Sequence, residues 1–179
     1  MTARQTDLLL TFGKVTTLIL QGLCALAAAI FILLIPFVLL VSQDMLGGFA
    51  PAEDFPLMQH APLAYGGIAV LATALLGALF VFFGKMRKII ASVGEGDPFI
   101  AENANRLNSM AWLLLAVEIL ALLVGFLRLH LANLHSGGGE RLDFSVYDLT
   151  GFIVILVLFI LARVFRHGTA MRADLEGTV

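Results

Sequence analysis

The sequence contains few charged residues and almost no cysteine. Asp, Glu, Lys and Arg make up 13% of its 179 residues, against about 25% in an ordinary soluble domain. The single cysteine, Cys24, excludes a disulfide framework and a cysteine-rich metal cluster. A net charge of −2 leaves no cationic excess for direct binding of nucleic acid. Because 60% of the residues are hydrophobic and the mean hydropathy is +0.97, the composition indicates a small integral membrane protein.

Four apolar stretches are long enough to cross a bilayer. A hydrocarbon core about 30 Å thick needs about 20 apolar residues in a helix. The four stretches cover residues 15–41, 63–83, 110–131 and 149–164, approximately. Because the segments between them are short, we expect one all-α domain over residues 1–179, a four-transmembrane-helix bundle in a lipid bilayer.

The basic residues are distributed unequally between the connecting segments. Nine of the eleven Lys and Arg residues lie in the N-terminal tail, between the second and third spans, or near the C-terminus. The remaining loops carry mainly Asp and Glu. Because cytoplasmic loops of membrane proteins are enriched in Lys and Arg, both termini are predicted to be cytoplasmic.

The second and third spans are predicted to extend into the cytoplasm as a helical hairpin over residues 84–109. No helix-breaking residue follows the second span for two to three turns, and two glycines then end the helix. Asp97 is a typical N-cap, and Pro98 suits the first position of the next helix. We therefore expect that helix to run from Pro98 to Leu131.

The hairpin has two interpretations, a well-capped connector or a docking surface for a cytoplasmic partner, and the sequence leaves both open. Long ordered protrusions are natural partner sites. The candidate partner-binding residues are Lys85, Arg87, Lys88, Asp97, Pro98, Phe99, Glu102, Asn103 and Arg106.

The last helix is expected to continue beyond its span to about Glu176, with Gly168 as a weak point. Arg163, Arg166 and Arg172 lie along this extension and suit the anionic cytoplasmic leaflet.

Glu118 is the only carboxylate well inside a predicted span. A carboxylate at that depth is costly, so we expect it to face the bundle and to be protonated, hydrogen-bonded or paired. Its candidate partners are Thr16, Thr17, Gln21 and Thr73. Either a structural hydrogen bond or a site that responds to protons or a ligand fits this pattern.

No pattern of catalytic residues is present. The serines lack a fixed histidine partner, and no phosphate-binding loop, zinc-protease motif or dinucleotide fingerprint occurs. His60, His130 and His135 share the outer side without close ligand spacing. We therefore predict no enzyme activity, no cofactor and no metal site.

One cluster of residues resembles a known family. The cluster comprises Gly96-Asp97-Pro98-Phe99, Glu102-Asn103, Arg106-Leu107 and Trp112, with the tail from Val164 to His167 and from Leu175 to Val179. It is similar to an uncharacterised bacterial family of small four-helix membrane proteins that carry a domain of unknown function. Its members are often encoded beside a small Cro/CI-type helix-turn-helix regulator. The resemblance implies a bacterial inner-membrane location and a transcription regulator as partner, without an established activity.

A purely structural subunit of a larger complex is one possible function, and two more specific functions are considered beside it. The first is a membrane-embedded regulatory or interaction protein, sensing or sequestering, with its partner on the hairpin and C-terminal helix. The alternative is a carrier of lipid or another hydrophobic ligand, or a small transporter component, with Glu118 in a cavity of the bundle. Packing within the chain explains the small residues in the first two spans at least as well as a homo-oligomer does.

Overall fold

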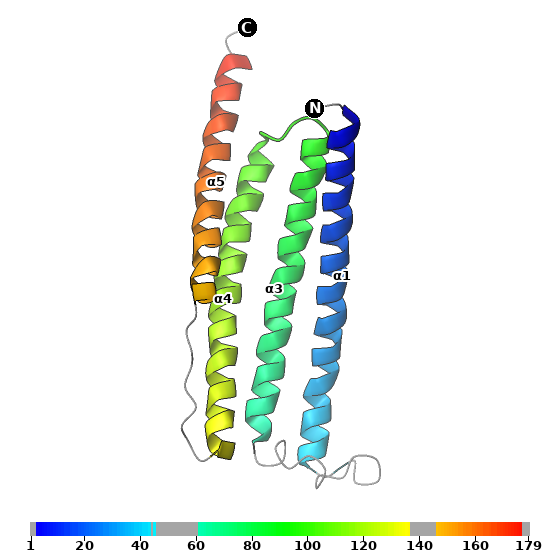
Figure 1. The fold of residues 1–179 in the computed structure, drawn as a ribbon, viewed down its shortest axis with the longest axis vertical. Coiled ribbons are helices and arrows are strands. Elements are labelled where there is room, and N and C mark those ends of the chain that lie inside the picture. Colours follow the sequence, from blue (N-terminus) through cyan, green and yellow to red (C-terminus); the bar gives the residue numbers. More distant parts are fainter. Residues whose placement is uncertain (1–2, 44, 46–60, 137–145, 177–179) are drawn as a thin grey trace. The chain divides into compact units, whose positions relative to one another are not determined.

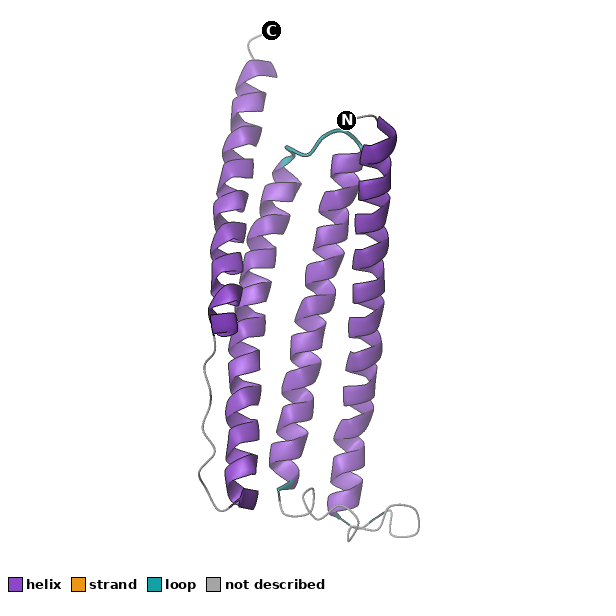
Figure 2. Ribbon diagram, viewed as in Figure 1, coloured by secondary structure: helices purple, strands orange, loops and turns teal. Residues whose placement is uncertain are grey.

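The computed structural model describes residues 3–43, 45, 61–136 and 146–176, and the structural statements below concern these residues. They form four α-helices and no strand (Figures 1 and 2). The helices are α1 (Ala3–Ser42), α3 (Pro62–Gly94), α4 (Ala101–Ser136) and α5 (Val146–Glu176). The predicted all-α fold class is thus confirmed.

Each helix contains one of the predicted spans and is longer than it. All four are long and apolar enough to cross a membrane. The helix α3 continues 11 residues beyond Phe83 to Gly94, as expected from the lack of helix breakers. The helix α5 continues to Glu176 as expected, and it passes through Gly168 without a break. Only 6–17% of the most apolar window of each helix is buried within the chain. Large side chains such as Leu33 and Phe126 point outward, as they do in a membrane protein.

The chain divides into two compact units that take different stretches of the helices. Unit 1 comprises Met1–Leu23, Ala78–Ala116 and Ser145–Val179, and unit 2 comprises Cys24–Gly77 and Val117–Phe144. In unit 2, Val38 and Val41 of α1 and Ala69 of α3 are buried. An added Cβ at Gly67 would lie 3.2 Å from Leu127 of α4, so a glycine allows α3 and α4 to approach closely there.

Unit 1 contains segments of all four helices. Two glycines bring α1 and α3 together: a Cβ on Gly13 would lie 3.3 Å from Ile90, and one on Gly84 would lie 3.1 Å from the Nε2 atom of Gln21. These contacts place the N-terminal part of α1 antiparallel to the C-terminal part of α3. The core residues of unit 1 are Thr17, Ser92, Asn103, Ala104, Leu107, Met110, Ala111, Ile155 and Ala162.

Candidate functional site

The turn between α3 and α4, residues 95–100, begins as the two glycines predict. The helix α3 ends at Gly94, and Gly96 has a φ of 90°, a value that L side chains rarely adopt. The amides of Glu95 and Gly96 donate to the carbonyls of Ala91 and Val93. A non-glycine residue at position 96 would therefore be strained in this turn.

The predicted start of α4 is wrong, because the helix begins at Ala101 and not at Pro98. The amide of Asn103 donates to the carbonyl of Ile100, which closes the first turn at 3.0 Å. Asp97 lies four residues before the first residue of the helix and so is not its N-cap, and its carboxylate pairs with Arg172 of α5. Pro98 and Phe99 belong to the connecting segment, where the Phe99 ring contacts α5.

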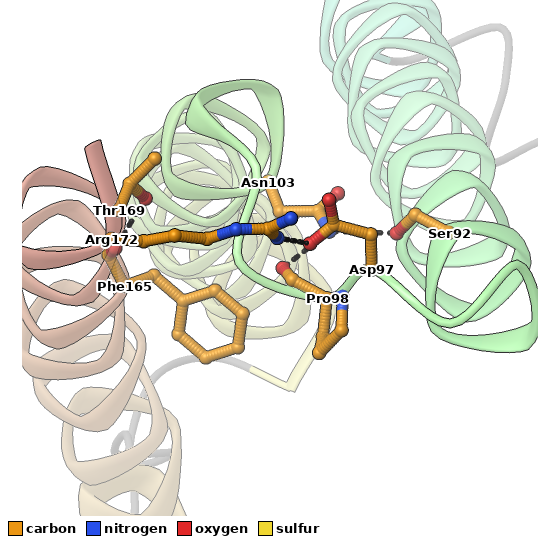
Figure 3. Close-up of polar contacts among 7 residues, drawn as sticks. All are labelled: Ser92, Asp97, Pro98, Asn103, Phe165, Thr169 and Arg172. Atoms are coloured by element: carbon orange, nitrogen blue, oxygen red, sulfur yellow. Dashed lines mark hydrogen bonds and ion pairs between the residues drawn. The ribbon is translucent and has the colours of Figure 1, made fainter. Parts of the chain in front are cut away.

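Asn103 holds the turn together from inside. Its side chain is fully buried, and its Nδ2 group donates to the Ser92 hydroxyl of α3 at 2.6 Å and to the Pro98 carbonyl at 2.9 Å (Figure 3). Its Oδ1 atom accepts a 2.8 Å hydrogen bond from Arg106. Ser92 in turn donates to the Ile89 carbonyl. Asn103 therefore positions the turn and is not accessible to a partner in this structure, while Arg106 is anchored to it.

The C-terminal part of α5 packs against this turn through an aromatic pair and an ion pair. The rings of Phe99 and Phe165 have centroids 5.1 Å apart. A Cβ on Gly168 would lie 3.1 Å from the Phe99 ring, so the glycine makes room for that ring. Arg172 reaches the Asp97 carboxylate at 2.5 Å (Figure 3). The turn and the end of α5 thus form one continuous surface.

Sequence reasoning missed the roles of Phe165 and Gly168. It treated Gly168 as a weak point of the last helix, whereas α5 passes through it without interruption. The only usable signal was the spacing of Phe165, Gly168 and Arg172, which places them on one face at intervals of three and four residues.

An open groove of about 780 Å³ follows the contact between the turn and α5. We call it the α5 groove, and its lining residues are Phe99, Ile160, Arg163, Val164, His167, Gly168, Met171 and Arg172. Its apolar residues Ile160, Val164 and Met171 are each more than half exposed. No carboxylate is among the lining residues. The groove therefore combines an exposed apolar floor with basic edges.

Two further grooves lie in unit 1. A groove of about 550 Å³ on another face of α5 is lined by Asn108, Phe159, Ala162, Arg163, Arg166, His167 and Ala170. A groove of about 360 Å³ between α1 and α3, the α1–α3 groove, is lined by Lys14, Val15, Leu18, Arg87, Lys88 and Ala91. Two predicted partner-binding residues, Arg87 and Lys88, therefore face a different groove from Phe99 and the α5 arginines.

The remaining predicted residues are dispersed. Lys85 is partly buried on α3, and Glu102 is exposed in the first turn of α4. Trp112 stacks edge to face on Phe159 of α5, with ring centroids 5.4 Å apart. Arg163 and Arg166 both line the groove of about 550 Å³ on the other face of α5.

Glu118 lies in unit 2 on α4 and is partly buried. Of its predicted partners, Thr17 and Thr73 donate their hydroxyl protons to carbonyls of their own helices, at 2.9 and 2.8 Å. Its role as a structural or responsive group therefore stays a prediction.

The described residues contain no group of three or more His, Cys, Asp or Glu side chains placed to hold a metal ion. His60 and the side chain of His135 lie outside the described part of the chain, so the expectation about the outer histidines concerns residues that the structure does not describe.

Comparison with known proteins identifies a family. No curated protein and no solved structure matches the chain. A family described as "Protein of unknown function (DUF2975)" matches residues 46–179, which include α3, α4, α5 and every residue of the turn and the α5 groove. The chain therefore belongs to the DUF2975 family of proteins of unknown function.

Proposed function

We propose that this protein is a regulatory or interaction protein of a bacterial inner membrane whose α5 groove binds an acidic amphipathic helix of a cytoplasmic partner. In this proposal both termini and the 95–100 turn face the cytoplasm, in accord with the positive-inside distribution of Lys and Arg. The partner is a helix-turn-helix transcription regulator, as the family resemblance implies.

The α5 groove itself carries the proposal. An amphipathic helix binds such a groove by burying apolar side chains at intervals of three and four residues. Val164 and Met171, seven residues apart on α5, present an exposed floor for those side chains at and beyond the end of the predicted span, and Ile160 continues the floor into the span. Arg163 lies at the edge without a carboxylate among the lining residues, so the groove favours an acidic partner over a basic one.

The position of the groove along α5 also favours a cytoplasmic partner. The predicted span ends near Val164, and the lining residues continue to Arg172. At about 1.5 Å per residue, the groove extends roughly 12 Å beyond the span. A helix of a water-soluble protein can reach this part without entering the bilayer.

The alternative, a lipid carrier with a cavity around Glu118, has less support. The three grooves described above are open surface grooves of unit 1, and Glu118 lines none of them. A surface groove at the end of a span fits recognition of a partner better than transport of a ligand through the bundle.

A binding measurement on the full chain in nanodiscs tests the proposal. The probe is the purified Cro/CI-type regulator that the resemblance predicts beside the gene. Met171→Asp places a charge on the groove floor, and Val93→Asp is the matched control, because Val93 is an exposed apolar residue that lines none of the three grooves. Since burial of a Met side chain contributes about 1.5–3 kcal/mol, we expect Met171→Asp to weaken binding at least about tenfold.

The control should stay within about twofold of the unmodified chain, as expected for a surface change away from the interface. Failure of the unmodified chain to bind the regulator, or equal weakening in both variants, overturns the proposal. Self-association that Met171→Asp abolishes, seen by mass photometry without the regulator, would instead assign the groove to a second copy of this chain.

A further inference from the structure

We propose that the α1–α3 groove binds the phosphate headgroup of an anionic phospholipid from the surrounding leaflet. This inference concerns a different groove from the proposed partner site and does not depend on it. It rests on the residues that line the groove and on their position at the end of two membrane-spanning helices.

The groove has a basic half and an apolar half. Lys14, Arg87 and Lys88 supply three cations, and Val15, Leu18 and Ala91 supply the apolar wall. No carboxylate lines the groove, and among the described residues no ion pair joins these three cations to an acidic side chain. The groove therefore places three cations together with no carboxylate among its own lining residues.

The packing of α1 against α3 fixes the level of these groups. The contacts Gly13–Ile90 and Gly84–Gln21 place Leu18 near the level of Arg87. The Lys14 ammonium lies beside Gly94, the last residue of α3, since a Cβ there would be 3.6 Å from Nζ. Lys14 thus marks the end of the groove that lies nearer the turn.

The apolar half continues along α1 into the predicted span. Val15 and Leu18 are 49% and 54% exposed. Gly22 follows on the same face one turn later and has open space around the position of a Cβ. An acyl chain attached to a phosphate between Arg87 and Lys14 can therefore lie along Val15, Leu18 and Gly22.

This arrangement favours a lipid over other anions. Basic pockets between membrane helices at their cytoplasmic ends are typical headgroup sites. The first predicted span begins near Val15 and the second ends near Phe83, so Arg87 and Lys88 lie at the height of the phosphates. A free phosphate would use the cations alone, whereas a phospholipid uses both halves of the groove. A volume of about 360 Å³ is within the size range of small-molecule sites.

Native mass spectrometry of the full chain, released from nanodiscs of equal parts phosphatidylglycerol and phosphatidylcholine, tests the inference. The measured quantity is the ratio of bound phosphatidylglycerol to bound phosphatidylcholine. The test variant is Arg87→Gln with Lys88→Gln. Its matched control is Arg163→Gln with Arg166→Gln, which removes the same charge from α5.

We expect the unmodified chain to enrich phosphatidylglycerol, because each cation near the surface favours an anionic lipid about fivefold. Because Arg163 and Arg166 also face the anionic leaflet, the control measures the general effect of lost charge. The ratio should fall at least about fivefold further in the Arg87/Lys88 variant than in the control. Circular dichroism checks that both variants keep their helices.

Three results would overturn the proposal. They are a ratio near unity in the unmodified chain, an equal fall in both variants, and displacement of phosphatidylglycerol by millimolar inorganic phosphate. The second would show a general effect of charge on the leaflet, and the third would show a plain anion site without use of the apolar wall.

Discussion

Replacement of Asn103 by Ala removes the side chain that connects α3, the 95–100 turn and α4. Three hydrogen bonds are lost, to the Ser92 hydroxyl, the Pro98 carbonyl and Arg106. At about 1 kcal/mol net for each bond, with a larger cost where a buried group is left unsatisfied, we expect a loss of roughly 2–4 kcal/mol in the free energy of unfolding.

The structure offers a matched control on the same helix. Asn105 is exposed, and its replacement by Ala removes an amide two residues away without removing a hydrogen bond of the Asn103 network. We expect Asn105→Ala to change the free energy of unfolding by less than about 0.5 kcal/mol. Equilibrium unfolding in bicelles titrated with dodecyl sulfate, followed by circular dichroism, measures both variants.

A double-mutant cycle separates the contact with Ser92 from the rest. Ser92→Ala alone removes the acceptor of the 2.6 Å bond and leaves one N–H group of Asn103 unpaired. The cycle with Asn103→Ala should give a coupling energy of about 1 kcal/mol. If Asn103→Ala is as stable as Asn105→Ala, or if the coupling is zero, Asn103 does not hold the turn in the way the geometry indicates.

The other predictions concern the contact between the turn and α5, and the topology. Gly168→Val should loosen the end of α5, because its Cβ would meet the Phe99 ring at 3.1 Å, and faster amide hydrogen exchange near the turn would show it. Asp97→Asn should cost less than about 1 kcal/mol in thermal unfolding, because the ion pair that it removes is about half exposed. If Asp97→Asn destabilises the protein more at high salt than at low salt, the ion pair is not a salt-screened surface pair. With Glu102→Cys or Met45→Cys, both exposed, an impermeant maleimide should label only the latter in intact cells. Labelling of Glu102→Cys alone would show that the chain has the opposite orientation.

The helices follow from local properties of the sequence. The absence of a helix breaker between Lys85 and Val93 predicted that α3 continues beyond its span, and the glycines at positions 94 and 96 predicted the turn that follows. The predicted start of α4 at Pro98 was wrong. The Asp97 carboxylate, which was expected to cap this helix, instead forms an ion pair with Arg172. From one sequence, Asp followed by Pro indicates a local N-cap, whereas nothing in the sequence indicates that Asp97 pairs with a residue 75 positions away.

The apolar stripe of α4 also indicated that Asn103 is buried, although this was not predicted. The apolar stripe of Phe99, Leu107 and Met110 passes through position 103, four residues from two of its members. A polar residue on a buried stripe indicates a buried hydrogen-bond network, and the structure shows that network. Its polarity alone placed Asn103 among the partner-binding candidates, whereas its side chain is buried between α4, α3 and the turn.

The cations of unit 1 have distinct roles, although the positive-inside rule treats them as one class. Arg106 and Arg172 bind groups within the chain, to Asn103 and Asp97. Arg87 and Lys88 line the α1–α3 groove, and Arg163 lines the α5 groove. A charge reversal at Arg87 and Lys88 therefore tests lipid binding, and only a change within the α5 groove tests the partner. If both changes weaken the same interaction to the same degree, the long-range field of the basic residues governs binding and the separation of the grooves has no functional meaning.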